Sequence, residues 1–200
     1  MGSGYPNIEQ SDHFIPNFSM TDHLLFNNWV FENIRPYLRG RVLEIDSRSG
    51  LMSALFIENN IPVHLSDPNK NNRENLQKHY KENPNFKKVH NLDPNSSDFE
   101  NLHSNKFSLI DTVILTNVIE HGFYNEKAIQ NATKFLPLRG RIAIIIPAQT
   151  TLYSQDEENS ELMIKYNSKS IRSLLSPELE PIMITYCKFI TAMLIVARKI

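Results

Sequence analysis

Acidic side chains stand at three points where a predicted strand of this chain passes into a loop. Glu44 and Asp46 lie at the end of the first apolar stretch, Asp67 ends the second, and Asp93 follows the third. The carboxyl ends of parallel strands share one edge of a sheet, where α/β proteins bind nucleotide-like ligands. A carboxylate after the second strand can accept hydrogen bonds from both hydroxyls of a ribose. These residue types and positions therefore predict a nucleotide-like ligand site.

The loop after the first predicted strand is the most informative part of the chain. It runs Asp46-Ser47-Arg48-Ser49-Gly50 and leads into a helix near Leu51. The opposite charges of Asp46 and Arg48, two positions apart, favour an ion pair within the loop. If φ of Asp46 is positive, the strain costs about 1 kcal/mol or more.

Alternating strands and helices must position these side chains. Hydrophobic patterning predicts strands over 41–46, 62–67, 86–90, 108–116, 141–146, 181–186 and 191–197. It predicts helices over 23–38, 51–59, 69–80, 99–102, 125–136 and 168–175, with Thr21 or Asp22 capping the first and Pro36 ending it. The last two strands are too close for a helical crossover, so we expect them to pair antiparallel.

The alternation predicts an α/β fold in three layers. We expect a Rossmann-like seven-stranded sheet, mostly parallel, with an antiparallel C-terminal hairpin and helices on both faces. Residues 21–200 are expected to form a single domain. We interpret Met1-Gly2-Ser3-Gly4 as a tag remnant and residues 5–20 as an irregular arm.

Composition excludes several classes of function. The formal net charge of −1 does not favour a nucleic acid as partner, and no apolar run is long enough to span a membrane. Cys187 is the only cysteine, no Cys/His cluster has the spacing of a metal site, and no signal peptide is visible. We therefore expect a cytoplasmic protein without a metal.

Five segments in order resemble motifs of class I S-adenosylmethionine (SAM)-dependent methyltransferases. They are RGRVLEIDSRSG, VHLSDPN, VHNLDP, FSLIDTVILTNVIEH and LPLRGRIAIIIPA, and the resemblance runs from about Trp29 to Lys199. The first is similar to the family's [V/L]LE[I/V]GxGxG and the fourth to its FDxVxxxNVLEH. The resemblance implies SAM as the cofactor, with S-adenosylhomocysteine (SAH) as its product.

The resemblance also implies roles for individual residues. Glu44 would serve the methionine ammonium, Asp67 the ribose, and Asp93 the adenine amino group. Asn117 would line the methionine end, and His121 would shape the methyl-transfer end or act there as a base. Each acid has a structural alternative: an ion pair for Glu44, and a turn for Asp67 and Asp93.

The chain departs from the family at glycine positions. Asp46 and Arg48 replace the first two glycines of the loop and only Gly50 is kept, while Arg139 replaces the first glycine of the PGG turn. Arg48 could pair with the SAM carboxylate. It could equally neutralise Asp46 or Glu44 and fill the pocket.

Two functions follow from these observations. The first is a SAM-dependent methyltransferase acting on a small-molecule or sugar- or lipid-linked acceptor. The alternative is a catalytically inactive methyltransferase-fold protein that serves as a binding or partner subunit, for example as a homodimer or with another protein.

Overall fold

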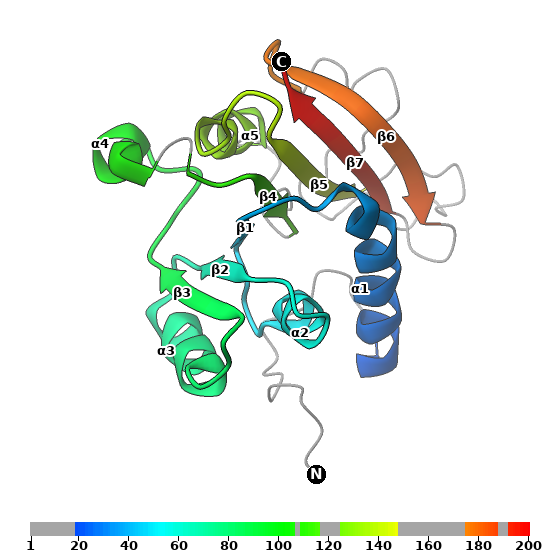
Figure 1. Cartoon of the computed structure of the whole chain (residues 1–200), viewed down its shortest axis with the longest axis vertical. Coiled ribbons are helices and arrows are strands. Elements are labelled where there is room, and N and C mark those ends of the chain that lie inside the picture. The colour runs from blue at the N-terminus through cyan, green and yellow to red at the C-terminus, as the bar shows by residue number, and fades with distance from the viewer. Residues whose placement is uncertain (1–18, 107–108, 117–124, 148–174, 188–191) are drawn as a thin grey trace, which may run out of the picture.

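A seven-stranded sheet forms the centre of the computed structural model (Figure 1), which describes residues 19–106, 109–116, 125–147, 175–187 and 192–200. The strands are β1 (Val42–Ile45), β2 (Val63–Ser66), β3 (Phe86–His90), β4 (Thr112–Leu115), β5 (Arg141–Pro147), β6 (Leu179–Cys187) and β7 (Ala192–Lys199). Their order is β3-β2-β1-β4-β5-β7-β6. The first five strands pair in parallel and β7 pairs antiparallel with both β5 and β6, which confirms the predicted sheet.

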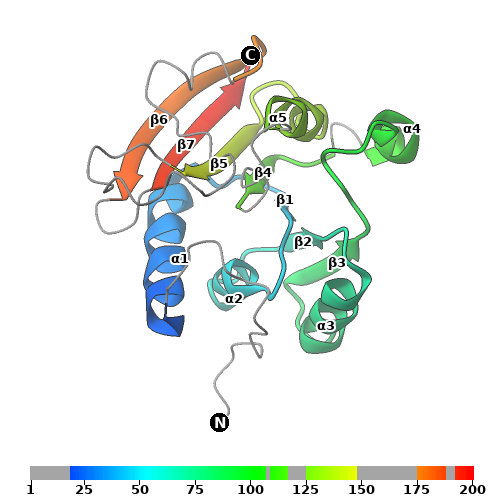
Figure 2. The same cartoon turned by 180° about the vertical axis from the view of Figure 1, so that it is seen from behind.

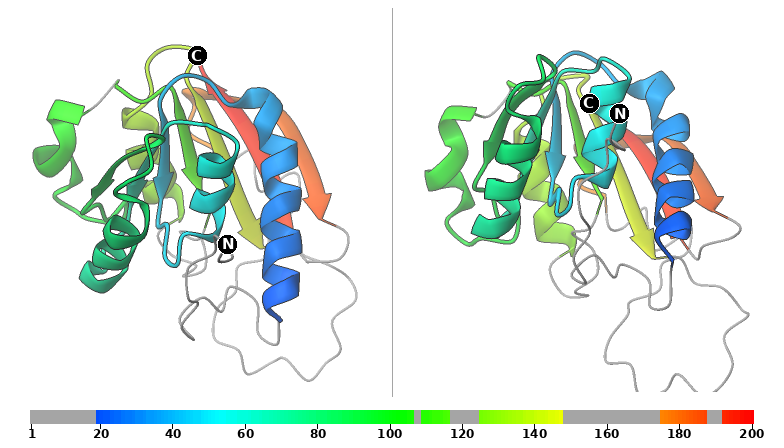
Figure 3. Two further views of the ribbon diagram at one scale, coloured as in Figure 1. Left: turned by 60° about the horizontal axis from the view of Figure 1, so that its bottom comes forward. Right: turned by 90° about the horizontal axis from the view of Figure 1, so that it is seen from below.

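Helices cover both faces of this sheet (Figures 2 and 3). The helical elements are α1 (Met20–Ile34), η2 (Arg35–Tyr37), α2 (Leu51–Glu58), α3 (Lys70–Tyr80), α4 (Phe99–His103), η3 (Ser104–Lys106) and α5 (Asn125–Lys134). The first three α-helices pack on one face, and α5 with the short α4 lies on the other. The predicted three-layer α/β architecture is therefore confirmed.

Strand alternation divides the core into two hydrophobic clusters. Leu43 and Ile45 of β1 face α5, whereas Val42 belongs to the cluster beneath α1 and α2. Helix α2 is buried on every side from Leu51 to Ile57, because it lies between the sheet and its helical neighbours. This burial fixes the start of α2 and with it the loop that follows β1.

Helix α1 begins earlier than the sequence predicted. Ser19 is the N-cap, and Asp22 is the third helical residue of a capping box, so the assignment of Thr21 or Asp22 as the cap was wrong. The hydroxyl of Ser19 accepts from the Asp22 amide, and the Asp22 carboxylate accepts from the Ser19 amide. Pro36 does end the helix: the chain tightens to a 3-10 turn from Arg35.

Strand β4 is shorter than the nine residues predicted for it. It begins at Thr112 because β1, its neighbour, begins only at Val42. Before that point the chain turns toward α5, where the Ile110 amide donates to the Phe135 carbonyl at 3.3 Å. The predicted helix over 168–175 lies outside the described residues except for Leu175, which is not helical.

Candidate functional site

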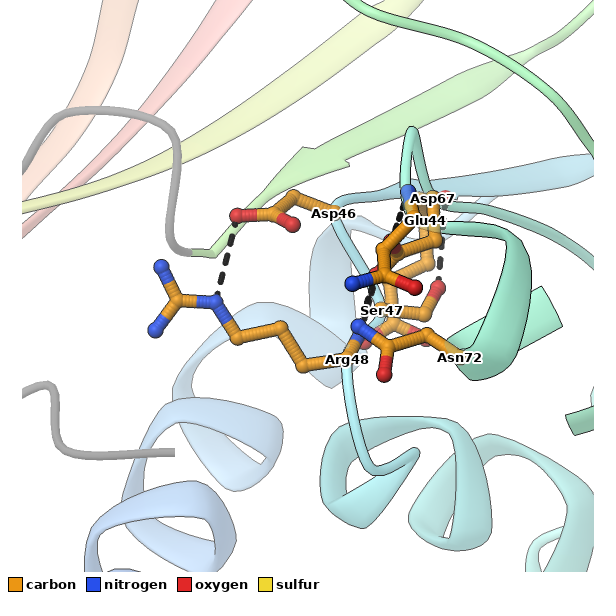
Figure 4. Close-up of polar contacts among 7 residues, drawn as sticks. Glu44, Asp46, Ser47, Arg48, Asp67 and Asn72 are labelled. Carbon is orange, nitrogen blue, oxygen red and sulfur yellow. Dashed lines mark hydrogen bonds and ion pairs between the residues drawn. The ribbon is translucent and has the colours of Figure 1, made fainter. Parts of the chain in front are cut away.

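The loop between β1 and α2 lies at the point where the strand order reverses. From β1 the chain proceeds to β2 and β3 on one side of β1, and then crosses to β4 on the other side. In open α/β sheets the crevice at such a switch point, at the carboxyl ends of the strands, is where ligands bind. Figure 4 shows the polar side chains that gather there.

The backbone of this loop is left-handed at alternate positions. The φ angles are 64° at Asp46, 47° at Arg48 and 86° at Gly50. Gly50 has a second constraint, since a Cβ there would lie 2.7 Å from the Leu76 side chain. Arg139 also has a positive φ, of 66°. Three non-glycine residues thus adopt a glycine-like backbone where the resemblance expects glycine, at about 1 kcal/mol or more each.

The side chains of Asp46 and Arg48 pair with each other. The Arg48 Nε donates to the Asp46 carboxylate at 3.3 Å, and the two side chains are 17% and 18% exposed. The sequence-based expectation of an ion pair inside the loop is confirmed. Figure 4 shows the arginine side chain extended along the loop to reach this partner.

Asp67 is buried and already holds the loop. One carboxylate oxygen accepts from the Asn69 amide at 2.7 Å. The other accepts from the Arg48 amide at 2.9 Å and from the Asn72 side chain at 3.2 Å. A carboxylate offers about four acceptor positions, so one position is left for a ligand hydroxyl. The turn predicted as the alternative role of Asp67 is present, and it ties the end of β2 to the loop after β1.

Glu44 is a buried carboxyl group whose partner is a hydroxyl. It is 1% exposed and accepts from the Ser53 side chain. Among the described residues it forms no ion pair, so the salt bridge expected as its alternative role is wrong. Burial, reinforced by the charges of Asp46 and Asp67, raises the pKa of Glu44 to about 8 against the opposing hydrogen bond from Ser53. Glu44 is therefore mostly protonated at neutral pH.

A small pocket opens beside Glu44. Its volume is about 40 Å³, well below the ~300–1,000 Å³ of most ligand sites. Three residues of α1 and the three central residues of the β1–α2 loop contribute to the wall. The lining residues are His23, Phe26, Asn27, Glu44, Ser47, Arg48, Ser49, Leu51, Met52, Thr116 and Ile145.

Other predicted site residues lie apart from this cluster or outside the described segments. Asp93 is exposed, and its side chain accepts from the Asn95 amide at 2.8 Å, which is the turn predicted as its alternative role. Asn117 and His121 lie outside the described residues. Within the described segments no group of His, Cys, Asp and Glu side chains could hold a metal ion, and no helix is long and apolar enough to cross a membrane.

Two residues of the site were missed by the sequence analysis. Ser53 is the one polar residue on a fully buried stretch of α2, and that pattern alone signals a buried hydrogen bond. Asn72 lies on the polar helix α3, where nothing in the sequence distinguishes it from its neighbours. Its contact with Asp67 is local, because Asn72 lies in the first turn of α3, five residues after Asp67.

The architecture and the position of the site define a class I SAM-dependent methyltransferase fold. No protein-family model matches the sequence, and no curated protein matches it. Solved structures do match. One is magnesium protoporphyrin IX methyltransferase from Synechocystis with bound SAH, at 15% identity and a TM-score of 0.67, covering 94% of this chain and 91% of that chain.

Two further methyltransferases give the same result. The 1,6-didemethyltoxoflavin-N1-methyltransferase of Burkholderia thailandensis, solved with bound 1,6-didemethyltoxoflavin and SAH, is 14% identical, with a TM-score of 0.64 over 86% of this chain and 76% of its own. A SAM-dependent methyltransferase from Methanosarcina mazei is 14% identical, with a TM-score of 0.64 over 84% and 97%. At this identity the likeness establishes the fold, and the site must be argued from its own residues.

Proposed function

We propose that this protein binds SAM and SAH at the β1–α2 loop and transfers a methyl group to a small-molecule or sugar- or lipid-linked acceptor. One observation carries the proposal. The loop keeps a left-handed backbone at Asp46, Arg48 and Gly50, although two of these residues strain to adopt it. Strain of this kind persists where the surrounding structure or a ligand requires the conformation.

The proposed cofactor site uses the charges of Asp46 and Arg48, which form an ion pair with each other in the structure. Arg48 leaves Asp46 and binds the carboxylate at the methionine end of the ligand, in a charge-assisted hydrogen bond. Asp46 and Glu44 then face the cationic groups of the ligand. The remaining proposed contacts are Gly50 in the loop, Asp67 at the ribose, Asp93 at the adenine and Asn117 near the methionine end.

The proposed chemistry asks for alignment rather than a strong base. SAM supplies an electrophilic methyl group on a sulfonium, and the protein holds the acceptor in line with it and excludes water. His121 is the proposed catalytic residue for acceptors that arrive protonated. We propose a cytoplasmic protein acting on a small molecule, and a homodimer or protein partner also belongs to the proposal.

A second candidate is a non-catalytic binding protein with this fold. It is favoured by the side chains that close the site: Asp67 is engaged in three hydrogen bonds, Arg48 is paired with Asp46, and the pocket holds only about 40 Å³. In this case the loop has become a structural element. SAM would then find no binding site in the loop, even if these contacts opened.

Calorimetric titration with SAM and with SAH tests the proposed cofactor site, and turnover of SAM to SAH with an acceptor separates the two candidates. Micromolar binding by the wild-type protein supports the methyltransferase, and Arg48→Ala is then expected to weaken binding about ten-fold or more by removing the charge-assisted bond. Arg139→Ala removes an arginine at a positive φ far from the loop and is the matched control. Absence of binding at millimolar ligand, or an Arg48→Ala variant that binds more tightly, would refute the proposed cofactor site.

A further inference from the structure

A second cavity lies on the face of the sheet opposite to the β1–α2 pocket. Its volume is about 190 Å³ and almost all of its surface is apolar. Strand alternation places Leu43 and His64 on this face, whereas Glu44 and Leu65 face α2 and α3. The lining residues are Arg41, Leu43, His64, His90, Leu92, Leu109, Ile110 and Phe135.

The cavity exists because the helical part of the crossover from β3 to β4 is short. Among the described residues of this crossover, the one α-helix is α4, which spans five residues and packs against α5: Phe99 meets Phe135 edge to face, and Glu100 pairs with Lys134 at 3.1 Å. Figures 1 and 2 show α4 beside α5 rather than over β2 and β3. In the described part of the chain this end of the sheet therefore keeps an apolar recess.

Two histidines give the recess a polar end. The Nδ1 of His64 and the Nε2 of His90 lie 3.1 Å apart, so the rings share one hydrogen bond across β2 and β3. Burial lowers the pKa of His64, and the nearby charges of Arg41, Lys87 and Lys88 lower it further. The neutral His64 imidazole therefore lies in a positive field. Arg41 is also paired with the Asp111 carboxylate at 3.3 Å.

The size of the recess limits what can occupy it. An apolar cavity of about 150 Å³ accommodates benzene, so about 190 Å³ suits a single substituted ring. A positive field favours a negative charge on that ring, and an imidazole N–H is a donor for a carboxylate. We propose that this cavity is a second ligand site, which binds a small aromatic carboxylate with its ring against Leu43, Leu92 and Phe135.

The preference for a carboxylate on the ring is tested by NMR titration of the ¹⁵N-labelled full chain with benzoate and with its neutral near-isostere benzamide. The expected Kd for benzoate is about 1 mM or tighter. Benzamide is expected to bind about five-fold more weakly, because it lacks the charge. The backbone amides of β2 and β3 should shift, while those of the β1–α2 loop should not.

Two leucine variants identify the site. Leu109→Trp fills the cavity from its exposed rim and is expected to abolish binding, whereas Leu138→Trp alters a more exposed leucine that does not line the cavity. His64→Phe keeps the apolar volume and is expected to erase the preference for benzoate over benzamide. Three results would overturn the proposal. The first is that benzoate fails to bind at a concentration 20-fold above about 1 mM. The others are equal binding of the two probes to the wild type and equal loss of binding in both tryptophan variants.

Discussion

Replacing Glu44 by glutamine should change how the stability of the protein depends on pH. The carboxyl group is buried with a pKa of about 8 in the folded chain, against 4.5 as its ordinary value. The folded protein therefore holds a proton that the unfolded chain releases between these two values. Its contribution to stability is fully present below about pH 4.5 and is lost as the pH rises through about 8.

The size of the effect follows from the two pKa values. Between pH 4.5 and 8 each pH unit costs about 1.4 kcal/mol of unfolding free energy, which gives at most about 5 kcal/mol over the whole range. Water that reaches the ionised carboxylate would reduce this loss. Glutamine is nearly isosteric with the protonated acid, can still bond Ser53, and does not ionise.

Urea denaturation at half-unit steps from pH 4.5 to 8.5 measures the difference directly. The unfolding free energy of Glu44→Gln minus that of the wild type should rise steadily across the range, by several kcal/mol. Glu58→Gln, at the exposed end of α2, controls for the loss of one carboxylate. A difference for Glu44→Gln that stays constant with pH, or that follows the Glu58→Gln control, would show that Glu44 is not a buried neutral acid.

Three further predictions concern the strained loops and the site. Arg139→Gly should be about 1 kcal/mol more stable than Arg139→Ala, a rise in Tm of about 2–4 °C by calorimetry, because only glycine relieves the positive φ; equal Tm values would contradict this. Asp67→Asn should lose about 2–3 kcal/mol in urea denaturation, since an amide has one acceptor atom and cannot accept from Asn69 at one end and from Arg48 and Asn72 at the other; a loss below about 0.5 kcal/mol would mean that the buried bonds contribute nothing. Binding of SAM at pH 7 should release close to one proton, because Glu44 must ionise beside a cationic ligand; calorimetric enthalpies that do not vary with buffer ionisation enthalpy would count against that contact.

The order and type of the elements could be predicted from the sequence because they depend on local patterns. The seven apolar stretches became seven strands, and the short connection between the last two required an antiparallel pair. The first and last residues of each strand were harder to predict, because a strand ends where the neighbouring strand that it pairs with ends. The chain before Thr112 is apolar enough for a strand, but no neighbouring strand extends beside it.

The candidate site was predicted in its location and only partly in its contacts. Acids at strand ends gave Glu44, Asp46 and Asp67, since the carboxyl edge of a parallel sheet is fixed by chain direction. One contact depends on packing between distant segments: Asp67 accepts from the amide of Arg48 because β2 lies beside β1. The contact with Asn72 is local, because Asn72 lies five residues later in the first turn of α3.

The sequence alone determined that this chain is an α/β protein with a polar loop at the switch point of its sheet, because hydrophobic period and residue type act locally. Tertiary structure decided which charges are neutralised. A carboxylate that is merely near apolar residues in the sequence, as Glu44 is, becomes a protonated acid only when α2 and the sheet exclude water from both sides of it. The recess beside His64 and His90 likewise depends on tertiary structure, because the five-residue helix α4 is too short to cover that part of the sheet.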